Sequence, residues 1–329
     1  DSFARSWGIP VAGAFRRQDA IPNTSPAWAG NLGYGPNPKL VARIKAADLL
    51  LVVGARLGEA TTDGYTLVTP DHPGQTLIHV HPDAGELNRV YRADLGITAP
   101  VFEFAAMVAA ADAPATPRPA CADAHAEWQD WSTPKPRDGV ALDLGQCVAA
   151  MRERIDAEHA IVCNGAGNFS GWWHRYWRYG AQPSQLAPTA GAMGYGTPAA
   201  VAAALRRKDK LAVALAGDGD FLMNGQELAT AVQHGADMLV LVIDNGAYGT
   251  IRMHQEREFP ARLSGTTLHN PDFAALARAY GCWAETVERT EYFAPTLDRA
   301  LAERGVRLLH LKTDVEIITP ATTITAIRG

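Results

Sequence analysis

The sequence lacks several features that mark other classes of protein. Its 30 Lys+Arg against 35 Asp+Glu give a net charge of −5 with no basic run, so nucleic acid is not expected as a partner. No apolar stretch approaches the roughly 20 residues of a membrane span, and no membrane contact is expected. The four cysteines form no CxxC pair, and the opening DSFARSWGIP carries no signal-peptide pattern. These absences predict a cytoplasmic protein whose cysteines serve packing.

Hydrophobic residues are abundant, and their spacing alternates between two periods. They make up 47% of 329 residues, enough for a large core and about two domains. Short strand-type runs such as ADLLLVVGAR, KLAVALAGDGD and MLVLVIDNGAYG are separated by helical stretches. Strands that alternate with helices predict parallel sheets covered on both faces. The predicted fold class is α/β, with two doubly wound domains and mainly parallel sheets.

A Pro/Ala-rich stretch separates the two predicted domains. Residues 111–137, ADAPATPRPACADAHAEWQDWSTPKPR, show too little apolar periodicity for a core element. We expect an α/β domain over 1–115 that is incomplete at its start, a linker over 116–139, and a second domain over 140–329.

A βαβ pattern occupies the middle of the second domain. Strands are predicted over 211–216 and 238–243, with a helix over 225–234 between them. Because this crossover makes the strands parallel, Asp218 and Asn245, which follow them, lie on the sheet edge where open α/β sheets bind ligands. Carboxylate and amide oxygens suit Mg²⁺ or Ca²⁺, and the adjacent glycines let backbone N–H groups approach an anion. The pattern indicates a metal-bound diphosphate.

Two helices of this domain carry start signals. Asn224 followed by Glu227 has the pattern of a capping box ahead of the helix at 225–234. Thr197 followed by Pro198 is typical of an N-cap and a first helical residue, so the glycine-rich loop before them leads into a helix. Taken alone, GDG is also an ordinary tight turn. The order of strand, GDG, helix, strand and asparagine favours the metal site.

Residues 217–248 resemble the cofactor motif of thiamine diphosphate-dependent enzymes, which begins with GDG and ends in a pair of asparagines. Asp244 stands here in place of the first asparagine. In that family the second asparagine coordinates the metal. The resemblance implies Mg²⁺ held by Asp218, Asn245 and the backbone carbonyl of Ala247. It implies cofactor contacts from Gly217, Gly219, Asp220 and Tyr248, with Gly219 and Asp220 acting through backbone N–H groups.

Two further segments resemble the same family. PTAGAMGYGTPAA, at 188–200, is similar to the segment that grips the aminopyrimidine in the acetolactate synthase-like branch. By this resemblance Met193 bends the cofactor from beneath, and the Gly191 carbonyl accepts a hydrogen bond from its amino group. A methionine that fills a core gap is the alternative. In CNGAGNFSGWW the resemblance implies diphosphate contacts from Gly167 and Asn168. Core or interface packing is favoured for the aromatic residues that follow, Trp172, Trp173, Tyr176 and Trp177.

The first domain resembles the central domain of the same enzymes, which in acetolactate synthases proper carries FAD. Arg56 could meet a nucleotide phosphate, but a solvated loop arginine is an equal alternative, because relatives keep this fold without a nucleotide. His79 and His81 share one face of a strand. Two histidines without a third ligand make a poor metal site, so ordinary strand residues are favoured.

The resemblance implies an enzyme dependent on thiamine diphosphate and Mg²⁺ that acts on a 2-oxo acid, with acetolactate synthase-like carboligation after decarboxylation. A 2-oxo acid decarboxylase or C–C lyase of the same family is the alternative. Two alternatives belong to other classes, a Mg²⁺–nucleotide module and a non-catalytic cofactor-binding or interaction fragment. The family's activating glutamate comes from an amino-terminal pyrimidine domain that nothing here resembles. We therefore name no catalytic residue, and expect a carboxyl-terminal portion that is inactive alone and a full protein that is a homodimer or tetramer.

The substrate pocket departs from the acetolactate synthase pattern. Those enzymes place a tryptophan after the metal asparagine, and by counting His254 stands at that position. Tyr248, Ile251, Arg252 and His254 are expected to line the pocket, with Arg252 available to a substrate carboxylate. In the alternative, Arg252 and His254 form the surface face of a helix.

Overall fold

The computed structural model describes residues 1–116 and 120–329. The chain forms two compact units, Asp1–Trp131 and Ser132–Gly329. In the described ranges, no helix has the length and apolar character needed to cross a membrane. Three of the four cysteines are buried, and all four are free. The three buried cysteines therefore serve as packing residues, as predicted, while Cys121 is only partly buried.

The first unit contains small parallel sheets with helices around them. Its elements are α1 (Ser2–Trp7), β1 (Val11–Gly13), β2 (Trp28–Asn31), α2 (Pro38–Lys45), β3 (Leu49–Val53), β4 (Thr76–His81), the 3-10 turn η1 (Ala84–Glu86), β5 (Leu95–Thr98), α3 (Val101–Ala109) and α4 (Ala120–Trp131). β1 pairs with β2, and β3, β4 and β5 form a three-stranded sheet, all in parallel. The buried side chains of Leu40, Leu77 and Tyr91 belong to its core.

The linker predicted over 116–139 is in part a helix of the first unit. Within that stretch, residues 117–119 lie outside the described residues. α4 buries Trp128, whose ring meets Trp28 edge to face with centroids 6.2 Å apart. Glu127 accepts a hydrogen bond from Arg43 at 2.9 Å. The helix is stabilised by this packing on β2 and α2, which sequence periodicity alone did not reveal.

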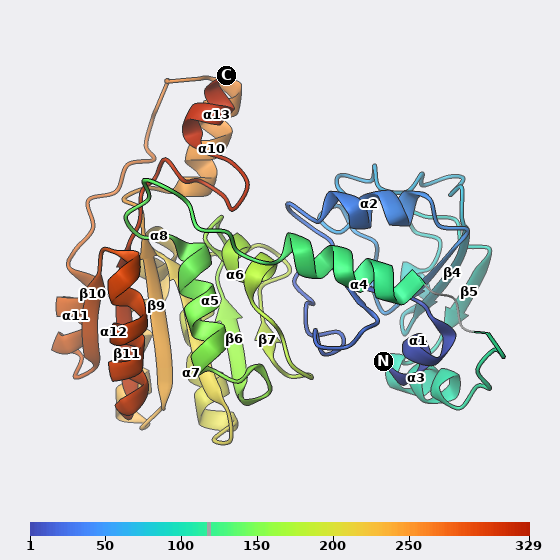
Figure 1. The fold of residues 1–329 in the computed structure, drawn as a ribbon, viewed down its shortest axis with the longest axis horizontal. Coiled ribbons are helices and arrows are strands. Elements are labelled where there is room, and N and C mark those ends of the chain that lie inside the picture. The colour runs from blue at the N-terminus through green and yellow to red at the C-terminus, as the bar shows by residue number, and fades with distance from the viewer. Residues whose placement is uncertain (117–119) are drawn as a thin grey trace. The chain divides into compact units, whose positions relative to one another are not determined.

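The second unit is a six-stranded parallel sheet between two layers of helices (Figure 1). Its elements are α5 (Leu144–Arg154), the 3-10 turn η2 (Ala157–His159), β6 (Ala160–Asn164), α6 (Ser170–Tyr176), β7 (Gln185–Leu186), α7 (Gly196–Arg206), β8 (Leu211–Gly217), α8 (Asp218–Asn224), α9 (Glu227–Gln233), β9 (Met238–Asp244), α10 (Gly249–Glu258), α11 (Phe273–Ala279), β10 (Trp283–Val287), α12 (Thr290–Ala302), β11 (Val306–Lys312) and α13 (Ile324–Arg328). The strand order is β10-β11-β9-β8-β6-β7.

Strand residues of the second unit alternate between two cores. Val213 and Leu239 face one side, where α5, α6 and α12 pack, and Ala214 and Val240 face the other, where α7, α9 and α11 pack. Each fully buried Val or Leu side chain among them contributes roughly 1.5–3 kcal/mol. The sheet is therefore buried on both faces, which confirms the predicted doubly wound fold.

The strand order places a switch point beside β6. The chain passes from β6 to β7 on one side and then to β8 on the other side. In such sheets, ligands bind beyond the carboxyl ends of the strands where the order reverses. The loops after β6, β8 and β9 meet at this edge.

Two predicted helix starts are wrong. α8 begins at Asp218 with Gly217 as its N-cap, so Asn224 ends this helix instead of capping the next one. Its side chain donates to the Gly194 carbonyl, which explains why it does not serve as a cap. α7 begins at Gly196, which makes Pro198 its third residue.

Candidate functional site

Loops at the carboxyl edge of the sheet in the second unit surround a cavity of about 230 Å³. Nearly all the residues predicted from the sequence line it, namely Gly167, Asn168, Gly191, Met193, Gly217, Asp218, Gly219, Asp220, Asn245, Ala247, Tyr248 and Ile251. Arg252 and His254 are not among the lining residues. The β6, β8 and β9 ends and the loop before α7 thus form one cavity.

The candidate metal ligands gather around one backbone N–H group. The amide of Ala247 donates to Asp218 Oδ2 at 3.2 Å and to Asn245 Oδ1 at 3.1 Å. Within the described residues, no cluster of three or more His, Cys, Asp or Glu side chains could hold a metal. A cation here would use one carboxylate, one amide oxygen and a backbone carbonyl, with other oxygens from water or phosphate. Mg²⁺ is commonly bound in this way.

The carboxylate of Asp218 is held in an unfavourable environment. Its side chain is 3% exposed, and burial raises its pKa to about 6, with the facing Asp244 carboxyl adding to the rise. Hydrogen bonds from Asn270 and from the Gly219 amide, the latter at 2.9 Å, oppose this rise. A buried carboxylate that lacks a cationic partner is costly, and a bound divalent cation would offset that cost. The donor set and its electrostatics therefore fit a hard cation.

Asn270 and His310 belong to the site, and the sequence reasoning missed both. Asn270 Nδ2 donates to Asp218 Oδ2 and to Asp244 Oδ1, each at 2.7 Å. The buried His310 donates through Nε2 to Asp244 Oδ2 at 2.8 Å. Burial would raise the pKa of Asp244, but the hydrogen bonds from His310, Asn270 and Gly246 outweigh it and hold the pKa at about 2. The aspartate that replaces the family asparagine is thus ionised and fully engaged.

The loop after β6 is tied to the first turn of α10. The backbone N–H of Asn168 donates to Thr250 Oγ1 at 3.0 Å, and that hydroxyl donates to the side-chain oxygen Oδ1 of Asn168 at 3.0 Å. The Phe169 ring covers Gly217 so closely that a Cβ there would lie 2.8 Å from it. Of the following aromatic residues, Trp172 is buried and also lines the cavity, while Trp173 is fully buried in the core.

Two polar residues of α10 that were expected in the pocket, Arg252 and His254, do not line the cavity. Arg252 pairs with the fully buried Glu256 at 2.8 Å, and Arg328 of α13 pairs with the same carboxylate at 2.7 Å. The bonds from Arg328, the Ala261 amide and Arg252 hold the pKa of Glu256 well below its usual range. His254 is exposed. The expected pocket role of Arg252 and His254 is therefore not supported, because Arg252 is held by Glu256 and His254 is exposed on the helix surface.

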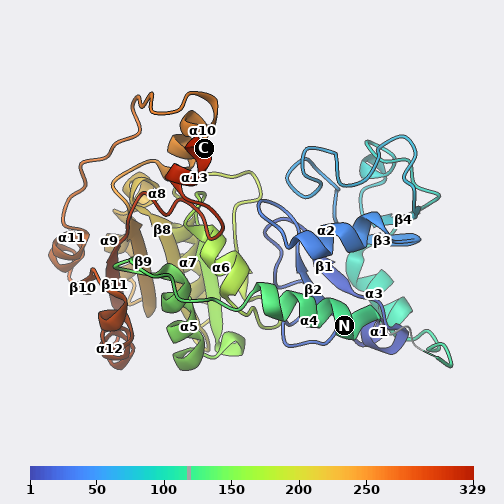
Figure 2. The ribbon, with the colours of Figure 1, turned by 45° about the horizontal axis from the view of Figure 1, so that its top comes forward.

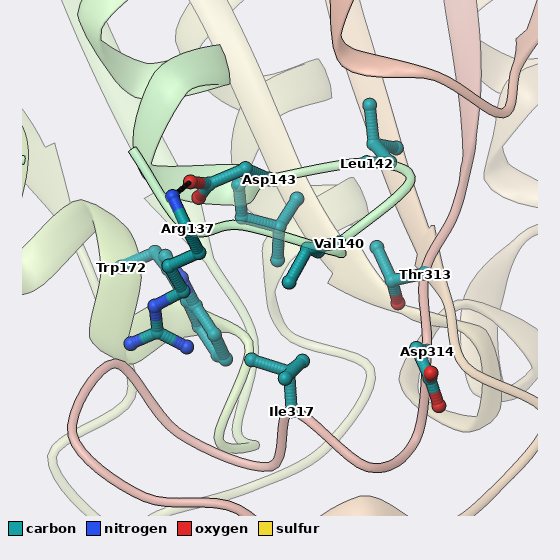
Figure 3. A pocket seen from close by; sticks show the side chains of 9 residues that line it. Arg137, Val140, Leu142, Asp143, Trp172, Thr313, Asp314 and Ile317 are labelled. Carbon is teal, nitrogen blue, oxygen red and sulfur yellow. Dashed lines mark hydrogen bonds between the residues drawn. The ribbon is translucent and has the colours of Figure 1, made fainter. Parts of the chain in front are cut away.

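α13 lies beside α10 in both views (Figure 1, Figure 2). The segment before it, 313–320, forms part of the cavity wall through Thr313, Ile317 and Ile318. Next to this wall is a recess of about 10 Å³, in which Trp172 and Ile317 lie near Arg137 (Figure 3). A single water needs about 10–15 Å³, so the recess holds no organic ligand.

His79, His81 and Arg56 of the first unit contact neighbouring protein groups. His79 Nε2 lies 2.9 Å from the Ala55 carbonyl oxygen, and the Asp83 amide donates to His81 Nδ1 at 3.1 Å. Arg56 is largely exposed and lies 3.4 Å from Glu86. These contacts match ordinary strand and loop residues.

Comparison with known proteins identifies both units. Residues 1–108 match the family described as "Thiamine pyrophosphate enzyme, central domain", and residues 165–311 match "Thiamine pyrophosphate enzyme, C-terminal TPP binding domain". The chain is 27% identical over 318 residues to the acetolactate synthase isozyme 2 large subunit of Escherichia coli, covering 95% of this chain and 56% of that protein. It is 26% identical over 334 residues to sulfoacetaldehyde acetyltransferase of Alcaligenes xylosoxydans, covering 91% and 54%.

A solved structure shows the same fold. The thiamine diphosphate-dependent 4-hydroxybenzoylformate decarboxylase of Rhodococcus jostii RHA1 superposes with a TM-score of 0.77 at 26% identity. The match covers 95% of this chain and 57% of that one, so the chain spans about half the length of these relatives. With two successive domains matched and the motif residues gathered in one cavity, the chain belongs to the thiamine pyrophosphate enzyme family.

Proposed function

We propose that the cavity binds thiamine diphosphate with Mg²⁺, and that the protein acts on a 2-oxo acid by decarboxylation followed by acetolactate synthase-like carboligation. The observation that carries the proposal is the meeting of Asp218 and Asn245 oxygens around the Ala247 amide, inside the cavity that Met193 also lines. The buried carboxylate of Asp218, which faces the Asp244 carboxyl and has a raised pKa, supports a cation at this point.

In this proposal, different parts of the cavity would bind the metal, the diphosphate and the pyrimidine. Asp218, Asn245 and the Ala247 carbonyl would hold the metal, and the start of α10 would face the diphosphate, because a helix amino end favours negative charge. Gly191 and Met193 would contact the pyrimidine. When bound, thiamine diphosphate supplies the carbon nucleophile and electron sink for loss of CO₂ from a 2-oxo acid. Phe169 and Ile318 would keep water away from that region.

The lining favours no particular 2-oxo acid. No Arg, Lys or His is among the residues that line the cavity in the described part of the chain, so these side chains offer no cation to a substrate carboxylate. The relatives include synthase, acetyltransferase and decarboxylase activities. A decarboxylase or C–C lyase of the same family is therefore the second candidate.

Activation of the cofactor needs a carboxyl group free to transfer a proton, and the described residues that line this cavity offer none. The only carboxylates that line it in the described ranges are those of Asp218 and Asp220. Asp218 accepts three N–H groups and Asp220 accepts the Gly194 amide. We therefore expect the 329-residue chain to bind the cofactor but to decarboxylate pyruvate no faster than free cofactor does. Turnover of order 1–10³ s⁻¹ by this chain would contradict that expectation.

The cavity mouth is also a proposed contact with a second copy. Large apolar side chains near it are exposed, with Tyr195 at 37%, Met223 at 47% and Ile251 at 51%. Apolar groups gathered around a binding site often mark a protein interface. A homodimer or tetramer that covers this mouth is the expected assembly.

Calorimetry tests the binding proposal directly. Thiamine diphosphate should bind the chain only with Mg²⁺ present, and Asp218→Ala should abolish that dependence. Asp209→Ala, which removes an exposed carboxyl, is the matched control and should bind normally. The proposal fails if the wild type binds Mg²⁺–ATP in preference, or if Asp218→Ala keeps its Mg²⁺-dependent affinity.

A further inference from the structure

Both backbone polar groups of Gly194, the residue after Met193, are held by side chains of α8. The Gly194 N–H donates to Asp220 Oδ1 at 2.7 Å, and Asn224 Nδ2 donates to the Gly194 carbonyl at 2.9 Å. Gly194 is buried and outside regular structure, so its backbone groups need such partners. Asp220 and Asn224 are four residues apart, which places them on one face of the helix.

The contact between α8 and this loop is tightly fitted. A Cβ on Gly194, whose φ is +79°, would lie 2.8 Å from both Asn224 Nδ2 and Met223 Cβ. The Asp220 carboxylate is 3% exposed and sits against Gly165, where a Cβ would come within 2.1 Å of Oδ2. A side chain at either position would force these groups to move. The Asp220 carboxylate is therefore seated between the loop after β6 and the loop before α7, and Asn224 contacts the loop before α7.

α8 begins at Asp218, the candidate metal ligand. The same short helix thus carries Asp218 at its start and, further along, the two side chains that hold the Met193 loop. A shift of α8 would move both ends of the cavity together.

We propose that Asp220 and Asn224 are positioning residues that set the place of Met193 in the cavity by clamping Gly194. The inference rests on the proposed function, since Met193 is there the residue beneath the pyrimidine. The clamp ties the pyrimidine end of the cavity to α8, while Asp218 at the start of that helix stays at the metal end. Neither side chain is required to touch the pyrimidine for this role.

Two ligands test the two ends of the cavity independently, because pyrophosphate lacks the pyrimidine that thiamine diphosphate carries. Asp220→Ala and Asn224→Ala would be titrated by calorimetry with thiamine diphosphate and with inorganic pyrophosphate, each with Mg²⁺. We expect about a tenfold loss of thiamine diphosphate affinity, as for a lost hydrogen bond to a charged or buried group, and pyrophosphate affinity within about twofold of the wild type. Asp220→Asn keeps an oxygen that accepts the Gly194 N–H and should restore most of the affinity. The control Gln233→Ala removes an exposed amide at the end of α9 and should bind as the wild type does.

Equal losses for both ligands, or no loss for either, would overturn the clamp. A second measurement needs no ligand. Amide hydrogen exchange over 188–195 should become about tenfold faster in the two alanine variants, and unchanged exchange would also overturn the proposal. If the wild type bound neither ligand, the proposed function would fail, while the exchange data would still judge whether α8 holds this loop.

Discussion

Replacing Asp218 by asparagine tests two effects of its buried carboxylate separately. One is the loss of stability that the charge causes in the ligand-free protein, and the other is the binding of Mg²⁺ with the cofactor. A folded-state pKa of about 6 against an ordinary 3.8 corresponds to a penalty of ~3 kcal/mol, an upper bound, once the group is ionised. Because the folded pKa is raised, the penalty is absent below the ordinary pKa, grows between the two values and is complete above the folded one. Asparagine carries no charge and avoids it. One of the three N–H donors that Asp218 accepts would, however, face an amide NH₂ group, which costs about 1–2 kcal/mol.

The ligand-free Asp218→Asn variant should therefore unfold in urea with a free energy ~1–2 kcal/mol above that of the wild type at pH 7.5. The gain should disappear near pH 4, where the folded Asp218 is protonated and about half of the unfolded chains carry it protonated as well, so that most of the penalty is gone. The same variant should lose the stabilisation that saturating thiamine diphosphate and Mg²⁺ give the wild type, about 2.7 kcal/mol at one hundred times Kd. Asp209→Asn, at an exposed position, should gain no stability. A destabilised ligand-free variant at pH 7.5, or a gain that persists at pH 4, would refute the reasoning.

Three other changes test separate parts of the site. Asn270→Ala leaves two carboxylates facing each other without their shared donor, so Mg²⁺-dependent cofactor affinity should fall about tenfold by calorimetry; the neighbouring exposed His269→Ala should have no effect. Gly165→Ala would displace the Asp220 carboxylate and should lower the free energy of unfolding by ~2 kcal/mol in urea titrations; an unchanged midpoint would show that the carboxylate can move freely. Glu256→Gln removes the charge that two arginines share, so trypsin should release α13 faster than in the wild type, and equal cleavage rates would show that the ion pairs do not hold this helix. Light scattering of the full-length protein at micromolar concentration should show a dimer or tetramer, and a monomer alone would contradict the proposed interface.

Sequence reasoning worked best where the signal was a repeated local pattern followed by a topological rule. The apolar runs over 211–216 and 238–243 lie within β8 and β9. Once a parallel crossover joined them, Asp218 and Asn245 had to meet at one edge of the sheet, and the structure brings them to one amide. The glycine-rich loop with Met193 reached the same cavity because it leads into α7, which packs on β6 and β8.

Errors arose where packing outweighed local preference. Asn224 has the sequence pattern of an N-cap, but its side chain is used by Gly194, and the helix around it starts at the strand end instead. Residues 120–131 have the composition of a linker, yet they fold as α4 because Trp128 has a buried place against Trp28. Arg252 has the charge expected of a carboxylate-binding residue, but its guanidinium pairs with Glu256 of its own helix.

The sequence by itself determined the α/β class, the parallel sheet of the second unit and the edge at which its polar residues meet, since strand period and crossover handedness depend on neighbouring residues along the chain. Only the tertiary structure decided which side chains support those residues. Asn270 meets Asp218 from 52 residues away, and His310 meets Asp244 from 66 residues away. No local period links residues at such separations. Their contacts exist because the buried carboxylates need donors, and the packed sheet brings those donors within hydrogen-bond distance.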